Sequence, residues 1–122
     1  MTPDFWTFLD ELVALCTITI DRPRNSAHPR NPALIYPYDY GYLGGTTSGD
    51  GQGIDVWLGS GDRAQVTGVV CTVDLFKRDA ELKVLLGCTA QDAQVISRFL
   101  DGTERLRCVV VPRPDAYADA SV

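Results

Sequence analysis

Aspartates beside glycine-rich or short turns are the residues of this sequence best suited to chemistry. Asp50 and Asp55 flank a turn in the stretch DGQGIDV, and Asp74 and Asp79 bracket the turn LFKR. Carboxylates from several loops at one end of a sheet are the hard oxygen ligands that Mg²⁺ prefers. Each aspartate alone is more often a solvated turn residue, but the four together predict a magnesium site.

A charged stripe is predicted on the strand that follows the LFKR turn. Side chains two apart on a strand point to the same face, so Asp79, Glu81 and Lys83 should project together. Such crowding of acidic groups is costly without cations nearby. This strand is therefore expected to lie beside the predicted metal site.

The elements that must position these residues are mostly short strands. Hydrophobic periodicity and turn residues predict helices over 2–15 and 89–102, the first capped by Thr2 and the second by Thr89 with Asp92. The predicted strands cover 16–20, 56–58, 65–75, 82–88 and 105–111, with a long loop-rich segment that has short extended pieces over 22–55 and a flexible tail over 112–122. We expect one domain over 1–122, a mostly β (α+β) fold with a small, twisted, OB-like β-barrel and peripheral helices.

Composition and charge exclude several classes of function. The chain has 122 residues, 45% hydrophobic and 22% charged, with a formal net charge of −5, which disfavours nucleic acid and acidic membranes as partners. No apolar run reaches the length of a membrane span and no signal peptide is evident, so a cytoplasmic protein is expected. The four cysteines are widely spaced and are expected to be free, buried thiols: Cys16, Cys71, Cys88 and Cys108.

The order of the motifs resembles that of soluble family I inorganic pyrophosphatases, of which this chain would be a short, divergent relative. An acidic residue ahead of a proline, the block YPYDYG, the block DGQGIDV and two aspartates around a turn follow one another between about residues 17 and 87. The resemblance implies hydrolysis of inorganic pyrophosphate to two phosphates by a metal-activated water. It also implies Mg²⁺ as cofactor, with Mn²⁺ or another divalent cation as alternatives, and a homo-oligomer.

The resemblance assigns roles to individual acidic residues. Asp50 and Asp55 match the family's signature metal ligands, and Asp74 and Asp79 match a pair that holds further metals. Asp21 resembles the glutamate of the family's Glu-x-Pro motif and would be an outer ligand.

Aromatic and basic residues are assigned to the substrate in the same way. Tyr36 and Tyr40 resemble tyrosines that line the family's phosphate pocket. The hairpin that carries an early basic clamp in the family is shortened here, which leaves Arg24 and Arg30 to hold phosphate oxygens.

Two departures from the family pattern keep other functions open. Gln52 stands where the family has the middle signature aspartate, which supports the attacking water, and a carboxamide cannot accept a proton. Glu81 replaces a phosphate-binding lysine, and Lys83, one same-face step further along, would bind the phosphate in its place. The alternatives are a hydrolase of another small diphosphate and a catalytically impaired module that binds metal or phosphate. The predicted catalytic residues are Asp55, Gln52, Tyr40 and Lys83.

Overall fold

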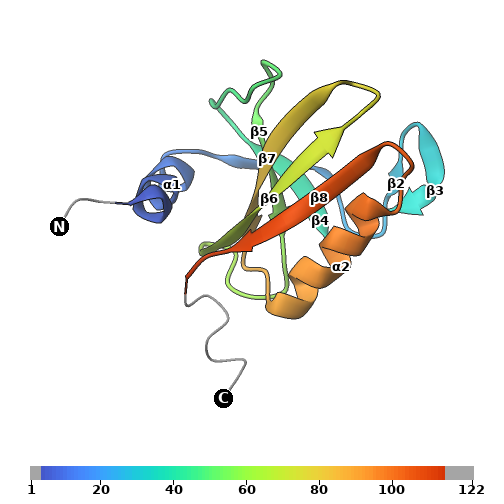
Figure 1. Cartoon of the computed structure of the whole chain (residues 1–122). Helices are drawn as coiled ribbons and strands as arrows, with labels where there is room; N and C mark the ends of the chain where they lie inside the picture. Colours follow the sequence, from blue (N-terminus) through green and yellow to red (C-terminus); the bar gives the residue numbers. More distant parts are fainter. Residues whose placement is uncertain (1–3, 115–122) are drawn as a thin grey trace.

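A mixed six-stranded sheet forms the centre of the protein (Figure 1). The computed structural model describes residues 4–114. The elements are helices α1 (Phe5–Ala14) and α2 (Ala90–Asp101) and strands β1 (Ile18–Arg22), β2 (Ala27–His28), β3 (Asn31–Ile35), β4 (Asp39–Leu43), β5 (Ile54–Leu58), β6 (Val66–Asp74), β7 (Asp79–Leu86) and β8 (Leu106–Pro112). The strand order is β1-β4-β5-β7-β6-β8, and β2 and β3 form a separate hairpin. Only the β5–β7 pair among the described strand pairs is parallel.

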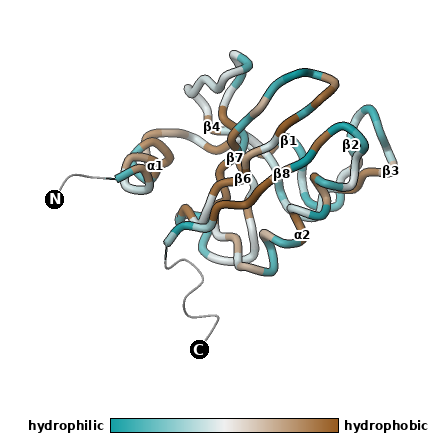
Figure 2. Tube along the Cα trace, viewed as in Figure 1, coloured by the Kyte–Doolittle hydropathy of each residue, from teal (hydrophilic) through white to brown (hydrophobic). Residues whose placement is uncertain are grey.

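Each face of the sheet carries its own hydrophobic core because side chains alternate along a strand. One face holds Val56 of β5 and Val84 of β7 and packs against α1. The opposite face holds Trp57 and Leu85 from the same two strands and packs against α2. Figure 2 shows hydrophobic residues along the central strands. The two helices thus lie on opposite faces, with the β2–β3 hairpin beyond one end of α2 (Figure 1).

Helix α2 is fixed to the sheet by a buried carboxylate at its N-terminus. The Asp92 carboxylate accepts hydrogen bonds from the Tyr38 hydroxyl at 2.7 Å, the Ser60 amide at 2.8 Å and the Thr89 amide at 3.0 Å. Burial acts to raise the pKa of Asp92, but these hydrogen bonds outweigh it and lower the pKa to about 2. The capping box predicted for Thr89 and Asp92 is confirmed, with Gly102 as the C-cap.

Replacing Asp92 by Asn is expected to lower the free energy of unfolding by about 1–3 kcal/mol, because donors lose a charged acceptor in a buried place. A carboxyl whose pKa is lowered on folding stabilises the folded state above its unfolded pKa and loses this effect as pH falls. The difference between the natural chain and the variant should therefore be full above about pH 4 and shrink as pH falls from the ordinary pKa of 3.8 toward about 2. Urea unfolding at pH 7 and at pH 3 measures it.

The exposed Asp62, whose carboxylate accepts only the Ala64 amide among the described contacts, provides the matched control as Asp62→Asn. A loss of stability in Asp92→Asn no larger than in this control, or one that does not shrink with acid, would contradict the role given to the Asp92 carboxylate.

The structure corrects several predicted boundaries. The first helix begins at Phe5, and its N-cap is Asp4, whose carboxylate accepts the Thr7 amide; Thr2 lies outside the described residues. The strand predicted over 16–20 lies at Ile18–Arg22, and β8 continues through Pro112 into the predicted tail, of which 115–122 fall outside the described residues. The segment 22–55 is more regular than predicted, since it contains β4, which pairs with both β1 and β5.

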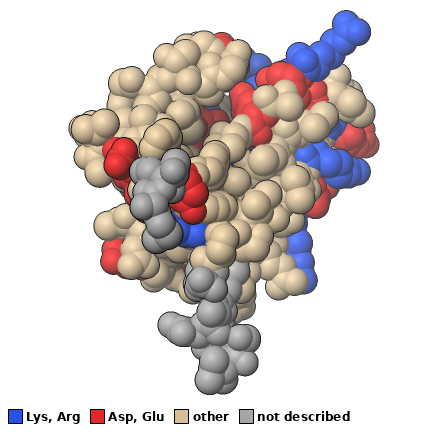
Figure 3. All heavy atoms as spheres, turned by 60° about the vertical axis from the view of Figure 1, so that its left-hand side comes forward, with Lys and Arg blue, Asp and Glu red and all other residues tan. Residues whose placement is uncertain are grey.

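The mostly β fold with helices at the periphery is confirmed. The sheet has β1 and β8 as its edges, and no pairing between these two strands closes a barrel within residues 4–114. All four cysteines are free as predicted, but only Cys88 is buried, and the other three are partly exposed. None of the described helices is long and apolar enough to cross a bilayer. Acidic and basic side chains form small separate groups on the face drawn in Figure 3.

Candidate functional site

The buried Lys83 contacts three other residues of the candidate site, at one end of the sheet face that packs against α2. The Lys83 ammonium donates to the Tyr40 hydroxyl at 2.8 Å, to Asp55 Oδ2 at 3.0 Å and to Glu81 Oε2 at 3.1 Å. The Tyr40 hydroxyl in turn donates to Asp55 Oδ2 at 2.6 Å. Three acceptors match the three donors of an ammonium group. The predicted catalytic residues Asp55, Tyr40 and Lys83 are therefore in direct contact.

Sheet register explains why these residues meet. Tyr40 lies opposite Trp57 on the neighbouring strand, and Asp55 precedes Trp57 by two residues, so all three side chains share a face. Val56 pairs with Val84 in the parallel β5–β7 ladder, which sets Lys83 beside Asp55. The site is thus a polar continuation of the face whose apolar part is covered by α2.

The pKa directions identify the protonation states in this cluster. Burial acts to lower the pKa of Lys83, but the attraction of Tyr40 and Asp55 outweighs it and raises the pKa. Burial, followed by the negative charge of Asp55, raises the pKa of Tyr40. At neutral pH the lysine is positive and the tyrosine is a neutral hydrogen-bond donor. The cluster therefore holds a fixed positive charge beside Asp55.

Asp50 joins the site through Glu81. The Asp50 carboxylate accepts the Ser48 hydroxyl and, at 2.8 Å, the Gln52 amide, and it lies near the Glu81 carboxyl. The bonds from Ser48 and Gln52 are the main causes that lower the pKa of Asp50 to about 2, whereas burial and then the nearness of Asp50 raise the pKa of Glu81. Two neighbouring carboxylates repel each other unless they share a proton or hold a cation.

Asp74 was predicted to bind a metal ion, but its carboxylate contacts backbone amides of its own turn and an arginine. Its carboxylate accepts the Phe76 amide at 2.9 Å and the Lys77 amide at 3.0 Å, and it lies 3.6 Å from the Arg105 guanidinium. The hydrogen bond from the Lys77 amide is the main cause that lowers the pKa of Asp74, whereas burial acts to raise it. Asp79 lies directly across the ladder from Asp74 and is half-buried. Sheet register therefore brings the pair together as predicted, while Asp74 stabilises its own turn.

The remaining predicted residues lie around this centre. Tyr36 is buried and its ring packs 5.6 Å from that of Tyr40. Gln52 is exposed in the turn after Asp50. Asp21 is exposed in a β-bulge between Ile20 and Arg22 of the edge strand β1.

The two predicted phosphate clamps lie apart from the lysine cluster. The Arg24 guanidinium lies over the Tyr38 ring, 5.4 Å from its centroid. Arg30 is exposed in the β2–β3 hairpin, where its amide donates to His28 Nδ1 at 3.0 Å. The His28 ring stacks on that of Tyr36, with 6.2 Å between the ring centroids.

The chemistry of the donor set fits a magnesium ion held by few protein ligands. No group of three or more acidic, histidine or cysteine ligands is preassembled within residues 4–114. Mg²⁺ nevertheless commonly binds through one or two carboxylates and completes its shell with water and substrate phosphate. The neighbouring Asp50 and Glu81 offer such a pair, with Asp55 beside it. Glu81 was not among the predicted ligands, although the two-residue alternation had placed it on this face.

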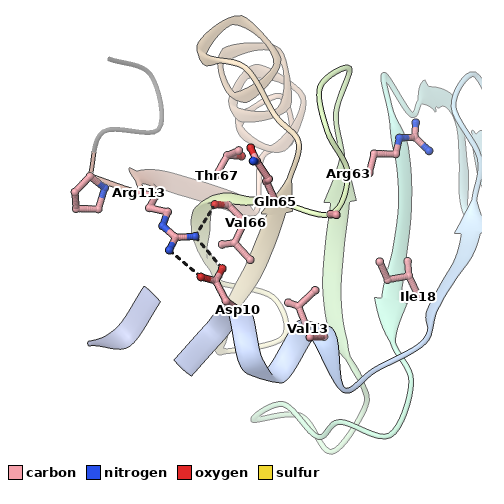
Figure 4. A pocket seen from close by; sticks show the side chains of 11 residues that line it. Asp10, Val13, Ile18, Arg63, Gln65, Val66, Thr67 and Arg113 are labelled. Carbon is pink, nitrogen blue, oxygen red and sulfur yellow. Dashed lines mark hydrogen bonds and ion pairs between the residues drawn. The ribbon is translucent and has the colours of Figure 1, made fainter. Parts of the chain in front are cut away.

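Another groove on the surface is lined by two arginines that already form ion pairs with aspartates. About 720 Å³ of space lies between α1 and the start of β6, bordered by Asp10, Arg63 and Arg113. Arg113 holds Asp10 through two nitrogens at 2.8 Å each, and Arg63 extends away from that pair, as Figure 4 shows, to contact Asp39 at 3.0 Å. The groove therefore stabilises the packing of α1 and contains none of the predicted site residues.

Comparisons with known proteins identify the fold. One similar solved structure is an inorganic pyrophosphatase from Coxiella burnetii, with a TM-score of 0.53, 14% identity and coverage of 79% of this chain and 83% of that chain. Another is an inorganic phosphatase from Anaplasma phagocytophilum, with a TM-score of 0.52, 19% identity and coverage of 84% and 85%. The chain shares their fold. No family model and no curated protein matches the sequence.

Proposed function

We propose that the protein is a magnesium-dependent hydrolase that splits inorganic pyrophosphate into two phosphates. The observation that supports it most strongly is the convergence of Asp55, Lys83 and Tyr40 with the Asp50–Glu81 pair. These residues come from β4, β5, β7 and the loop before β5, on a fold shared with an inorganic pyrophosphatase. Asp74 and Asp79 remain predicted metal ligands, and Asp21 remains a predicted outer ligand.

Asp50, Asp55 and Glu81 would hold the ion. Mg²⁺, or Mn²⁺ in its place, supplies positive charge that stabilises the phosphoryl oxygens and lowers the pKa of a water molecule. Lys83 holds Asp55 Oδ2 in place through a hydrogen bond of 3.0 Å. The neutral Tyr40 hydroxyl fixes the orientation of the same oxygen. Arg24 and Arg30 supply the outer positive charge for the substrate, and the ring of Tyr36 supports that of Tyr40.

Gln52 limits the rate of this reaction. A carboxamide cannot remove a proton from the attacking water, and loss of a general base typically reduces the rate by roughly 10²–10⁴-fold. The same residue supports a second function, a non-catalytic module that binds metal or diphosphate. The saturation of Lys83 by three acceptors also favours this second function, because no donor is left for a phosphate oxygen.

Phosphate release from pyrophosphate separates the two functions. The natural chain is expected to release phosphate slowly and only with Mg²⁺, and Gln52→Asp is expected to be faster by roughly 10²-fold, because the new carboxylate can act as general base. The exposed Gln91 on α2 provides a matched control as Gln91→Asp, which should leave the rate unchanged. Mg²⁺ binding measured by calorimetry, with no phosphate release from either the natural chain or Gln52→Asp, would instead establish the binding module.

A further inference from the structure

An aromatic cavity adjoins the lysine cluster on the α2 face. Its volume is about 130 Å³, and it lies between the β2–β3 hairpin and the end of α2. Trp57 stands 4.6 Å from Tyr40, 5.8 Å from Tyr36 and 5.7 Å from Phe99, measured between ring centroids. An apolar cavity of roughly 150 Å³ accepts one benzene molecule. The dimensions of this cavity therefore suit a single planar ring.

Two polar groups in the cavity wall have no partner. The Trp57 indole N–H and the Thr103 hydroxyl are buried, and neither has a hydrogen-bond partner within residues 4–114. Trp57 is fully buried, and both residues line the cavity. A buried donor without an acceptor costs free energy comparable to a lost hydrogen bond. These groups therefore favour an occupant that carries polar atoms as well as a ring.

A second hollow adjoins the cavity and forms its mouth. This hollow of about 290 Å³ shares four wall residues with the cavity and adds Arg30; the shared residues are His28, Leu34, Thr103 and Arg105. Burial and then the positive charges of Arg22, Arg105, Arg30 and Lys77 lower the pKa of His28.

Two arginines at this mouth can contact an anion. Arg30 and Arg105 line the second hollow together with Glu104, and Arg105 lies 3.6 Å from Asp74. A guanidinium group presents several N–H donors in a planar fork, which suits the oxygens of a phosphate group.

We propose that the two hollows form one binding site for a small organic phosphate. Its phosphate group lies among His28, Arg30 and Arg105, and its single ring lies against Tyr36, Trp57 and Phe99. Tyr40 and Lys83 border both this cavity and the proposed hydrolytic centre. The occupant therefore lies beside the carboxylate site without using its carboxylates.

Phenyl phosphate is the probe for this site, tested on the full natural chain without magnesium. Calorimetry should show binding that is roughly tenfold or more tighter than that of inorganic phosphate or of phenol, since each half-ligand fills only one hollow. In two-dimensional NMR, the indole N–H resonance of Trp57 should shift, whereas that of Trp6, which packs in the opposite core, should not. Because the measurement involves no metal and no turnover, its outcome is independent of the proposed hydrolase function.

A matched pair of arginine variants locates the phosphate. Arg30→Gln is expected to weaken phenyl phosphate binding roughly tenfold, with phenol binding unchanged, because it removes a charge from the mouth alone. Arg98→Gln, on the exposed face of α2, should have no effect. Phenyl phosphate that binds no tighter than inorganic phosphate, an unshifted Trp57 resonance, or equal weakening by both variants would overturn the proposal and leave a cavity filled by water.

Discussion

Replacement of Asp55 by Asn is expected to reduce magnesium-dependent pyrophosphate hydrolysis by roughly 100-fold or more, since even residues that only support a metal ligand cost roughly 10- to 100-fold. The Asp55 carboxylate is the shared acceptor of Lys83 and Tyr40, and it lies beside the Asp50–Glu81 pair. Asn has the same shape but lacks the charge that attracts a divalent cation. Turnover at several magnesium concentrations measures the effect, and the apparent magnesium affinity should fall along with the maximal rate.

Asp62→Asn is the matched control for this change. Asp62 is exposed and its carboxylate accepts only the Ala64 amide among the described contacts, so its variant should keep full activity. Circular dichroism establishes that Asp55→Asn is folded before its rate is compared. A folded Asp55→Asn protein with at least half of the natural rate would remove Asp55 from the catalytic centre.

Local sequence signals predicted the elements whose determinants are short-range. The capping box of Thr89 and Asp92 and the C-cap Gly102 marked α2 to within one residue at each end. Alternation along β7 placed Asp79, Glu81 and Lys83 on one face, which the structure confirms for the contact between Glu81 and Lys83. These features depend on local periodicity and on hydrogen bonds between close neighbours in the sequence, so a single segment of the chain contains the information needed to find them.

Features that depend on pairing between distant segments were harder to predict. Prolines and glycines over 22–55 indicated a loop, but β4 is a strand because β1 and β5 lie on either side of it. Gly41 is required there, since a Cβ atom at this position would stand 1.9 Å from the Thr19 carbonyl oxygen. The close approach of β1 and β4 is therefore a reason for this glycine that the local turn pattern does not contain.

The candidate site was only partly predicted, because it too depends on contacts between distant segments. Asp55, Tyr40 and Lys83 meet because register aligns three strands, but no local pattern shows that Glu81 lies near Asp50 or that Arg105 pairs with Asp74. The cavity around Trp57 was also missed, because its wall combines the β2–β3 hairpin with the end of α2. Family resemblance assigned roles to single positions, whereas these contacts join positions that the motifs treat separately.

Replacement of Lys83 by Met is expected to lower the free energy of unfolding by about 3 kcal/mol, the low end of the cost of removing one partner from a buried ion pair. Lys83 is buried, and Met matches most of its length without its charge. The cost stays at the low end because Glu81 can take up a proton and the Asp55 side chain is 32% exposed. Urea unfolding at pH 7 measures the loss, with the exposed Lys77→Met as the matched control, which should change stability little.

Magnesium should restore part of this stability in Lys83→Met and stabilise the natural chain less. In the natural chain the Lys83 ammonium already pairs with both Asp55 and Glu81, whereas in the variant those carboxylates lie together without a cation. A ligand that binds only the folded state stabilises it by roughly 2.7 kcal/mol at one hundred times its dissociation constant. Unfolding with and without Mg²⁺ therefore reports whether the carboxylates form a cation site at all, even if Gln52 has removed turnover. Equal stabilisation of Lys83→Met and the natural chain would show that the ion binds elsewhere, because a site that includes Asp55 and Glu81 must respond to the loss of the competing ammonium.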